Sequence, residues 1–473
     1  MVGRREQIET LKGCLSANRS SFVAITGRRR VGKTFLVDEV FKQNICLRIT
    51  GIQNADQKTQ IANFTQKLME YSKIPVVTPP KNWQQVFFLL KAYLNDLPND
   101  VKQVIFLDEL PWMATARSSF VQILAHIWND FLSKHKHFIL VICGSATSWI
   151  SKKIVNDKGG LHNRLSHVVH LKPFNLSETK EFLESKGIQM TNDALAEIYM
   201  TMGGIPFYLD SIKNGDSVSS TLDSMCFSEG GLLKYEYDNL YKALFENPEN
   251  HEAIVSALAT SKSGLTRKEI TQKSKVGEGG PYTRAMDELL ISGFVSEQTP
   301  FGKKKQGAVY RLTDEFSLFY HKFIKGNKKA AKGYWATVYD TQAYKIWCGY
   351  AFEVLCFRHL PEIKQKLGIS GIYIETGSYV HRGDHTSEGF QIDLILDRKD
   401  KAINLCECKF YQSEVKVDKV YAEKLLKRKA LFRLATKTRK TIFTTFITNS
   451  PHLQNDYASS AIDNFITIDN FIG

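Results

Sequence analysis

The sequence has no apolar stretch long enough to cross a bilayer. Its longest nearly uncharged run, residues 138–150, is shorter than the about 20 residues that a membrane helix needs. The run also contains Gly144 and several hydroxyl side chains, so we interpret it as a buried strand. The N-terminal residues, MVGRREQIET, lack the apolar core of a secretory signal peptide. We therefore expect a cytoplasmic protein without a membrane partner.

Cysteine is too sparse and too scattered for a disulfide framework. The chain has eight cysteines among 473 residues, and only Cys406 and Cys408 lie close together. They flank Glu407 in an expected strand, which puts the two thiols on one face and the carboxylate on the other. Because no second pair of zinc ligands is present, strand packing explains them better than a metal–thiolate site.

Internal repeats and long low-complexity segments are absent as well. The length predicts about three or four domains, and an apolar content of 43% is enough for several cores. The formal net charge of +14 favours an acidic partner such as nucleic acid. Net charge alone says little about function, so the positions of the basic residues matter more.

The first part of the chain, residues 1–175, alternates short apolar runs with longer amphipathic stretches. This pattern is typical of a parallel α/β sheet covered by helices. The expected strands are 21–26, 104–107 and 138–143, and the expected helices include 84–94 and 118–132.

Four further parts follow. They are a mainly helical segment that begins with Ser177 as its N-cap, a compact winged helix, a basic linker and a second α/β unit. Their expected bounds are 176–245, 246–325, 326–344 and 345–473.

Residues 27–34, GRRRVGKT, match the phosphate-binding pattern G-x-x-x-x-G-K-[ST]. An apolar strand enters this loop, and a helix expected over 34–42 leaves it. Backbone N–H groups and the positive end of the helix would bind the phosphates of ATP. Lys33 would reach the β- and γ-phosphates, and Thr34 would ligate Mg²⁺. The residues assigned to the nucleotide are Gly27, Arg28, Arg29, Arg30, Val31, Gly32, Lys33 and Thr34. The three arginines could instead contact a partner or form a solvated loop.

A second motif, VIFLDE at 104–109, places two carboxylates at the end of a buried strand. Ligands gather at this edge of open α/β sheets. We expect Asp108 to hold magnesium directly or through water, and Glu109 to polarise the attacking water. The sequence therefore predicts an ATPase that uses ATP and Mg²⁺.

Over roughly residues 1–325 the chain resembles the archaeal-type ATPases, a branch of the AAA+/STAND group of P-loop ATPases. The resemblance rests on the phosphate-binding loop and on six further motifs: VGRREQIET (2–10), LDELPW (107–112), CGSATSW (143–149), GG-L-x-x-R (159–164), KPF (172–174) and GGIPFYL (203–209).

This resemblance implies roles for residues outside the two main motifs. Ser145 matches a polar sensor, and Pro206 matches the G-x-P turn of a helical lid near the adenine. Gly3 and Arg4 match an N-terminal motif near the base. Arg164 matches an arginine that faces phosphate in its own subunit or in a neighbour's, although a surface salt bridge explains it equally well.

Residues 250–324 resemble winged-helix DNA-binding modules. Helices are expected at 251–260, from 266 and from 281, and wing strands at 294–297 and 308–312. The basic side chains that could meet phosphates are Lys262, Arg267, Lys268, Lys273, Lys275, Arg284, Lys303, Lys304 and Lys305. In STAND-type ATPases such a module often mediates packing or protein contacts, so both DNA and a protein partner stay open.

Near the C-terminus, Asp393 is followed fourteen residues later by Glu407-x-Lys409. This spacing fits the D…E-x-K signature of restriction-endonuclease-like nucleases. The two parts lie in the expected strands 390–398 and 403–410, and in the second strand Glu407 and Lys409 point to the same face. Glu353, from a helical run at 349–360, would complete the set of carboxylates.

Such carboxylates suit Mg²⁺ or Mn²⁺. The metal would stabilise charge on the scissile phosphate and lower the pKa of its water, and Lys409 would orient or activate that water. The catalytic assignment is therefore Glu353, Asp393, Glu407 and Lys409, with the three carboxylates as metal ligands.

Residues 416–440 contain ten Lys or Arg against two acidic residues. This strip could track a phosphate backbone. It is also explained by a helix with a solvated basic face and four inward apolar side chains, Val420, Leu425, Leu426 and Leu431. The C-terminal region as a whole resembles the nuclease-like domain that follows many archaeal-type ATPase modules, many of which have lost metal ligands.

The expected protein is thus α/β, with a parallel P-loop sheet, a helical lid, a winged helix and a C-terminal restriction-endonuclease-like domain. Three functions stay open. The first is an ATPase that controls a DNA nuclease, and the second is a nucleotide-switched DNA- or protein-binding regulator without cleavage. The third is a homo-oligomeric ring motor in which Arg164 acts across subunits.

Overall fold

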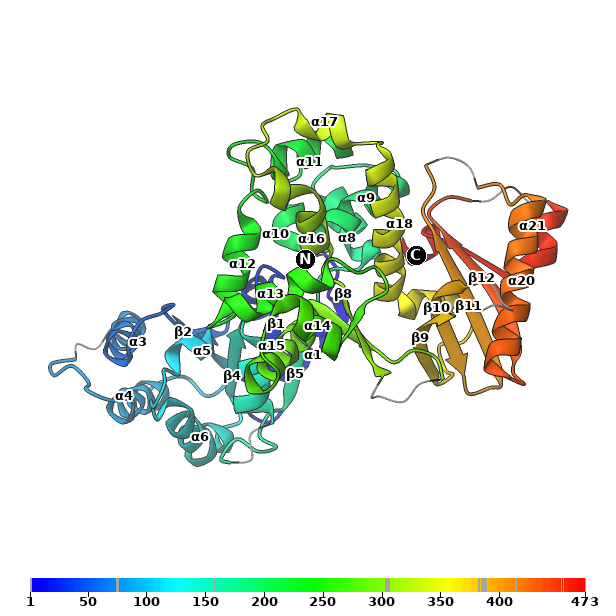
Figure 1. The fold of residues 1–473 in the computed structure, drawn as a ribbon. Helices are drawn as coiled ribbons and strands as arrows, with labels where there is room; N and C mark the ends of the chain where they lie inside the picture. Colours follow the sequence, from blue (N-terminus) through cyan, green and yellow to red (C-terminus); the bar gives the residue numbers. More distant parts are fainter. Residues whose placement is uncertain are drawn as a thin grey trace. The chain divides into compact units, whose positions relative to one another are not determined.

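The computed structural model describes residues 2–73, 76–156, 159–302, 307–381, 383, 389–412, 415–451, 453 and 455–472. The chain divides into two compact units, Met1–Pro173 and Phe174–Gly473 (Figure 1). None of the helices in these described segments is both long and apolar enough to cross a membrane.

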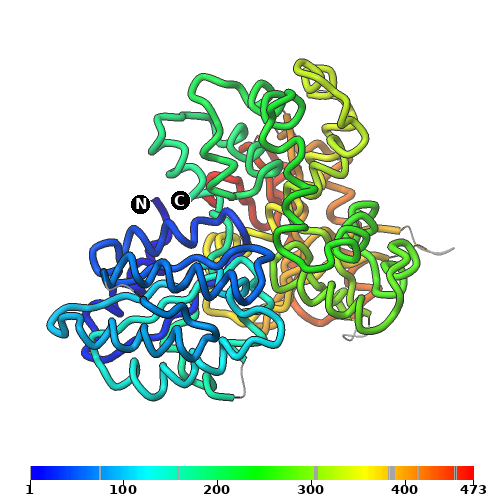
Figure 2. The backbone as a smooth tube through the Cα atoms, turned by 90° about the vertical axis from the view of Figure 1, so that its left-hand side faces the viewer, coloured from blue at the N-terminus to red at the C-terminus, as the bar shows by residue number. Residues whose placement is uncertain are grey.

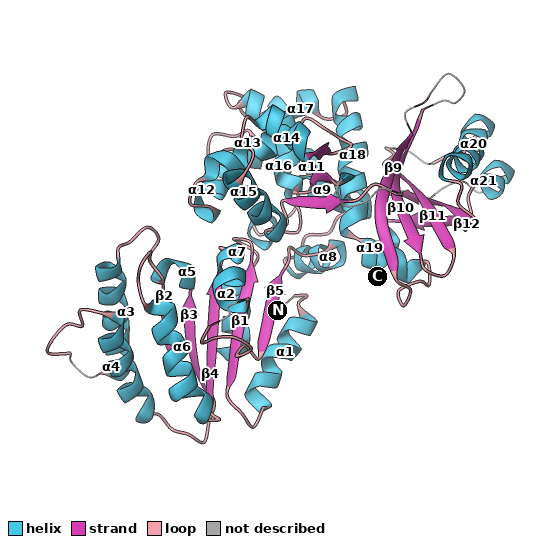
Figure 3. Ribbon diagram, turned by 60° about the horizontal axis from the view of Figure 1, so that its bottom comes forward, coloured by secondary structure: helices cyan, strands magenta, loops and turns pink. Residues whose placement is uncertain are grey.

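The first unit is built on a five-stranded sheet in the order β2-β3-β4-β1-β5. All four pairs of neighbouring strands are parallel. Figure 3 shows the strands side by side among their helices. The central strands β1, β3 and β4 are buried along their whole length, as expected for a parallel sheet covered on both faces. The strands are β1 (Ser21–Gly27), β2 (Ile45–Thr50), β3 (Gln103–Asp108), β4 (Phe138–Gly144) and β5 (His167–Leu171).

The helices of this unit agree with the amphipathic pattern, with one exception. The helix expected over 118–132 ends at Asp130, because Phe131 leaves the helical conformation before a short 3-10 turn at Leu132–Lys134. Edge-to-face ring contacts join Trp83 to Phe120 and Phe64. The helices are α1 (Arg5–Ser16), α2 (Lys33–Phe41), α3 (Gln57–Ser72), α4 (Trp83–Asn95), α5 (Leu110–Met113), α6 (Phe120–Asp130) and α7 (Thr147–Ile150).

The second unit begins with five helices. The sequence pattern suggested Ser177 as the N-cap of the first of these helices, but the structure shows otherwise. Asn175 takes that position, because its side chain accepts the backbone N–H of Glu178 while the Glu178 carboxylate accepts the N–H of Asn175. The helices are α8 (Leu176–Ser185), α9 (Asn192–Met202), α10 (Pro206–Leu209), α11 (Val218–Cys226) and α12 (Glu236–Leu244).

Three helices and a small antiparallel sheet, in the order β6-β8-β7, come next at the positions expected for the winged helix. Thr266 caps the second helix in a reciprocal bond with Glu269. Lys303, Lys304 and Lys305 lie outside the described residues. The elements are α13 (Pro248–Leu258), β6 (Leu265–Thr266), α14 (Arg267–Ser274), α15 (Gly280–Ile291), β7 (Val295–Gln298) and β8 (Val309–Leu312).

The segment expected as a basic linker, 326–344, is folded from Tyr334 onward. After α16 (Glu315–Phe319) and two short turns, α17 (Tyr334–Val338) buries Trp335 completely. The Trp335 ring stacks on Phe227 with a centroid distance of 5.5 Å, and its backbone N–H donates to Asp223 at 2.9 Å. One aromatic side chain therefore fixes this segment against α11.

The C-terminal sheet is mixed, with the order β13-β12-β11-β10-β9. Strands β9, β10 and β11 are antiparallel, whereas β11, β12 and β13 are parallel. Figure 1 shows α18 on one side of this sheet and α20 with α21 on the other. The elements are α18 (Gln342–Arg358), α19 (Leu360–Lys366), β9 (Ile374–His381), β10 (Phe390–Arg398), β11 (Ala402–Lys409), α20 (Lys419–Thr436), β12 (Thr441–Thr448), α21 (Asp456–Ala461), β13 (Asn464–Thr467) and α22 (Asp469–Ile472).

Two of the four apolar residues expected to pack inward on α20 do not do so. Val420 is 74% exposed and Leu426 is 42% exposed, while Leu425 and Phe432 are buried. Each residue turns the helix by about 100°, so Leu425 and Phe432, seven residues apart, share one face. Leu426, one residue after Leu425, points away from that face. The last helix returns to the start of the unit, as the path of the backbone in Figure 2 shows. There the Ser177 hydroxyl donates to the Ile472 carbonyl at 2.6 Å.

Candidate functional site

The phosphate-binding loop joins β1 to α2. Gly27 ends the strand with φ 147°, and a Cβ there would lie 2.3 Å from the Leu171 carbonyl oxygen, so only glycine fits. Gly32 caps α2 in the left-handed region, with φ 89°. The free N–H groups of the first helical turn therefore face the loop, which is a suitable arrangement for binding an anion.

Lys33 is buried at the start of α2. Its ammonium donates to the carbonyl oxygens of Gly27 at 2.9 Å and of Arg28 at 2.8 Å. A phosphate would offer this ammonium charged acceptors, which form stronger hydrogen bonds than carbonyl groups do.

Four polar side chains meet at the carboxyl ends of β1, β3 and β4. The Thr34 hydroxyl donates to Asp108 Oδ2 at 2.9 Å. One oxygen of Glu109, Oε2, accepts both the backbone N–H and the hydroxyl of Ser145 at 3.0 Å each. Glu109 is in the left-handed region, with φ 48°, and its own N–H donates to Asp108 Oδ1 at 3.0 Å. The structure thus brings together residues that the sequence placed in separate motifs.

The Thr34 and Asp108 oxygens fit a magnesium ion. Both are oxygen ligands, which Mg²⁺ prefers, and they lie 2.9 Å apart, so Thr34 and Asp108 would be the residues to hold the ion.

The N-terminal motif also reaches the loop. Arg4, which follows Gly3, is 5% exposed, and its guanidinium donates to the Val31 carbonyl at 3.4 Å. Arg28 is buried, while Arg29 and Arg30 are partly exposed.

Two other expected nucleotide contacts, Arg164 and Pro206, stay predictions. The Arg164 side chain is exposed. Pro206 belongs to the second unit, where it begins α10. The adjacent Gly204 is required there, because a Cβ would lie 1.9 Å from the Phe174 carbonyl oxygen.

A second polar cluster lies in the C-terminal sheet. The Lys409 ammonium is 3.0 Å from Glu407 Oε1 and 3.7 Å from Asp393 Oδ2. Asp393 and Glu407 are 7% and 5% exposed, and the antiparallel pairing of Leu394 with Cys406 makes them neighbours across β10 and β11. The Asp-Glu-Lys set expected from the sequence is therefore assembled.

Burial and like charge dominate the protonation of this cluster. Burial, followed by the charge of Glu407, raises the pKa of Asp393. Burial, followed by the charge of Asp393, raises the pKa of Glu353, which approaches the cluster from α18. Burial alone would lower the pKa of Lys409, but the nearby carboxylates outweigh it and raise that pKa. The lysine consequently stays charged while the carboxyl groups compete for ionisation.

Sequence analysis missed two further members of the cluster. Arg428 forms an ion pair with Glu407 Oε2, and the Tyr421 hydroxyl donates to Glu407 Oε1 at 3.1 Å. Both come from α20. Their spacing of seven residues puts them on the same helix face, which is the signal that could have identified them.

The cluster fits a divalent cation only in part. Asp393 Oδ2 is buried and accepts no hydrogen bond from any described residue, so a cation would satisfy it. Both Glu407 oxygens are engaged by Lys409, Tyr421 and Arg428. Among the described residues, no group of three or more His, Cys, Asp or Glu side chains is placed to hold a metal ion.

Comparisons with known proteins place the first part of the chain. Residues 1–212 match the model of a family described as an ATPase domain predominantly from Archaea. The uncharacterized protein MJECL04 of Methanocaldococcus jannaschii is 27% identical over 436 residues, covering 90% of this chain and 92% of that protein.

Two solved structures are similar at lower identity. The Walker-type ATPase of Pyrococcus abyssi is 17% identical and covers 68% of this chain and 96% of its own, with a TM-score of 0.45. The ORC2 protein of Aeropyrum pernix is 13% identical and covers 69% and 94%, with a TM-score of 0.41. The family match and the loop geometry agree on an ATPase domain in residues 1–212.

Proposed function

We propose that the protein binds and hydrolyses ATP as an AAA+/STAND-type ATPase, and that its nucleotide state controls a C-terminal, metal-dependent nuclease-like domain acting on DNA. The observation that carries the nuclease part is the Lys409 ammonium, which lies between the buried carboxylates of Asp393 and Glu407.

In the ATPase part, the contacts at the loop and at the ends of β3 and β4 support a role for each residue. Lys33 binds the β- and γ-phosphates, and Thr34 with Asp108 holds Mg²⁺. Glu109 accepts the proton of the attacking water, and Ser145 keeps that carboxylate oriented through its two hydrogen bonds.

In the C-terminal part, Asp393 would hold Mg²⁺ or Mn²⁺ through its buried Oδ2, and Glu407 and Glu353 would join it only after the cluster rearranges, because Lys409 and Arg428 engage Glu407. The metal would supply charge stabilisation at the scissile phosphate and a more acidic water. Lys409 positions that water, because its ammonium lies near both the Asp393 carboxylate of β10 and the Glu407 carboxylate of β11.

Basic side chains of α13–α15 and the loops between them form the proposed DNA surface. All six that the structure describes are exposed, which suits salt-dependent phosphate contacts. Arg267 is ordered by the ring of Tyr282, which lies 4.8 Å from its guanidinium carbon. The six are Lys262, Arg267, Lys268, Lys273, Lys275 and Arg284.

A second candidate function is a nucleotide-switched regulator that binds DNA or a protein without cleaving. The ion pair of Arg428 with Glu407 favours it, because that arginine neutralises a carboxylate that a metal would need. In this case the cluster stabilises the domain and carries out no reaction.

A plasmid-cleavage assay separates the two functions. Wild type, Asp393→Ala, Lys409→Ala and the control Lys366→Ala are compared with Mg²⁺ or Mn²⁺, with and without ATP. Lys366 is an exposed residue of α19 and has no assigned role in the cluster. We expect cutting by wild type and the control only, at a rate that changes with ATP. Cutting that persists in both cluster variants would contradict the site assignment, and DNA binding without any cutting by wild type would favour the regulator.

A further inference from the structure

Ser378 in β9 lies opposite an irregularity in β10. Ile392 pairs with Tyr379 and Ile395 pairs with Gly377, so Asp393 and Leu394 together oppose Ser378. This is a β-bulge, with two residues against one. It explains why Ile392 and Ile395, three residues apart, share one hydrophobic cluster. The direction of the Asp393 side chain therefore depends on where the bulge is held.

Ser378 is held from outside its own sheet. The backbone N–H of Phe301, after β7, donates to the Ser378 carbonyl at 3.1 Å. The Arg311 guanidinium, from β8, donates to the Ser378 hydroxyl at 3.3 Å. Both Ser378 and Arg311 are nearly inaccessible, at 4% and 3% exposure. We call these two hydrogen bonds the Ser378 contact.

Packing on both sides of the Ser378 contact is close. The Phe301 ring lies 5.2 Å from that of Phe432 on α20. On β9, a Cβ at Gly377 would lie 2.9 Å from the Thr299 carbonyl oxygen, so glycine permits the wing to approach the strand. The wing therefore packs as part of the C-terminal sheet's core.

Arg311 is suited to a fixed position. A guanidinium presents several N–H donors in a planar fork, and its burial costs free energy unless those donors are used. A second donor, Nε, bonds the Ser263 carbonyl at 3.3 Å, and the guanidinium carbon lies 5.7 Å from the centre of the Phe357 ring on α18.

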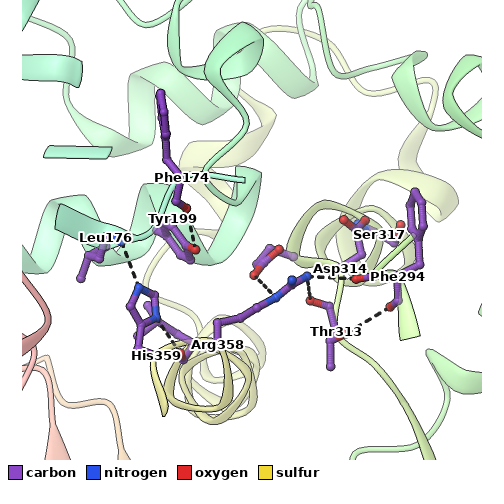
Figure 4. Close-up of polar contacts among 12 residues, drawn as sticks. Phe174, Leu176, Tyr199, Phe294, Thr313, Asp314, Ser317, Arg358 and His359 are labelled. Atoms are coloured by element: carbon purple, nitrogen blue, oxygen red, sulfur yellow. Dashed lines mark hydrogen bonds and ion pairs between the residues drawn. The ribbon is translucent and has the colours of Figure 1, made fainter. Parts of the chain in front are cut away.

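Arg358 ties α18 to the same module. Its guanidinium donates to the carbonyls of Gly293 at 3.1 Å and Thr313 at 2.9 Å, and its Nε lies 3.1 Å from Glu315 Oε1 (Figure 4). Glu353 precedes Arg358 by five residues on this helix. Helix α18, which carries Glu353, is thus fixed to the 246–325 module, whose residues Arg311 and Phe301 also bind Ser378.

We propose that the 246–325 module is a structural part of the acid cluster, in which Arg311 and Phe301 position Asp393 through Ser378 and Arg358 positions the helix of Glu353. The inference rests on the proposed metal-binding role of the cluster. It also implies that nucleic acid meets the module through α14 and α15, because the wing side is used by the C-terminal sheet.

The test compares Arg311→Met with wild type and with the control Lys366→Met in the full chain. One readout is backbone hydrogen exchange in β9 and β10, and the other is Mn²⁺ affinity of the nucleotide-free protein measured by electron paramagnetic resonance. We expect Arg311→Met to exchange faster around Ser378 and Asp393 and to bind Mn²⁺ about tenfold more weakly, as is usual when a residue that orients a ligand is lost. Arg311→Lys should recover little, because lysine lacks the planar fork.

A second variant guards against misfolding. Ser378→Ala removes only the hydroxyl acceptor and keeps the Phe301 bond, and we expect it to increase exchange in the same two strands. Wild-type exchange in both Arg311→Met and Ser378→Ala would overturn the inference. If wild type binds no Mn²⁺, the metal-binding role fails, and the exchange result alone decides whether the Ser378 contact positions the bulge.

Discussion

One oxygen of Glu109 accepts two hydrogen bonds from Ser145, one from its backbone N–H and one from its hydroxyl. Glu109 directly follows β3 and Ser145 directly follows the neighbouring strand β4, while Asp108, which accepts the Thr34 hydroxyl, also accepts the Glu109 backbone N–H. Ser145 thus orients the proposed base, whereas the basicity comes from the Glu109 carboxylate itself.

Replacing Glu109 by Gln should preserve ATP binding and lower hydrolysis by about 10²- to 10⁴-fold, the range for loss of a positioned general base. The amide oxygen can still accept both bonds from Ser145, so the geometry remains while the basicity is lost. Phosphate release and binding of a fluorescent ATP analogue measure the two effects. Ser145→Ala, which removes one donor to a charged group, should lower hydrolysis only about tenfold. Normal turnover in Glu109→Gln would refute the role of this residue.

Lys33→Ala should weaken ATP binding by about 10- to 100-fold, which corresponds to about 1.5–3 kcal/mol for hydrogen bonds to a charged group. Isothermal titration with ATP and Mg²⁺ measures the change. Lys12→Ala, an exposed position of α1, is the control and should bind as wild type does. Equal affinity in Lys33→Ala and the control would remove Lys33 from the phosphate site.

Local patterns predicted the parts of the site that depend on neighbouring residues in the chain. The strand before Gly27 and the helix after Gly32 follow from periodicity and from the loop motif itself. The shared face of Glu407 and Lys409 follows from the two-residue period of a strand. The Asn175 cap also has a local signal, because Glu178 stands three residues later and completes the capping box, whereas Ser177 lies inside the first turn of the helix.

Contacts between distant elements could not be predicted in this way. Arg311 and Ser378 are 67 residues apart, and neither has a local pattern that identifies the other. The bulge at Asp393 depends on how β10 pairs with β9 and is not apparent from the amino-acid sequence of β10. Likewise, the basic composition of 326–344 gave no indication that Trp335 is buried, because its burial depends on Phe227, more than 100 residues earlier.

Removing Arg428 should separate the two proposed functions of the C-terminal domain. Arg428→Gln frees Glu407 Oε2 from its ion pair but leaves the bonds from Lys409 and Tyr421 to Oε1. In a metal-binding domain, Mn²⁺ affinity should rise, since a carboxylate oxygen becomes available. In a domain without metal, Mn²⁺ binding stays absent and only stability falls, by about 1–3 kcal/mol for a buried charge that loses a partner. The control, Arg433→Gln, changes an exposed position of the same helix.

His359 should make the second unit less stable in acid. The imidazole is buried, Nδ1 faces the Leu355 carbonyl at 2.8 Å, and Nε2 accepts the backbone N–H of Leu176 at 2.9 Å, so the ring is neutral (Figure 4). Burial lowers the pKa of His359 to about 4. Because the unfolded chain, with a pKa of about 6.5, takes up the proton first, the stabilisation present above pH 6.5 is lost as the pH falls toward 4. Between pH 7 and 4.5 the loss should be about 2 kcal/mol.

Urea unfolding of wild type and His359→Gln at pH 7 and pH 4.5 measures this effect. The glutamine oxygen can accept the Leu176 N–H but cannot titrate, so the variant should lose less stability on acidification than wild type does. Burial also lowers the pKa of His321 to about 4. Because His321 is present in both proteins, its contribution to the pH dependence is the same in each and drops out of the comparison. A pH dependence that is unchanged in His359→Gln would mean that the pKa of His359 is not lowered in the folded protein, and the assignment of a neutral ring whose Nε2 accepts the Leu176 N–H would then be wrong.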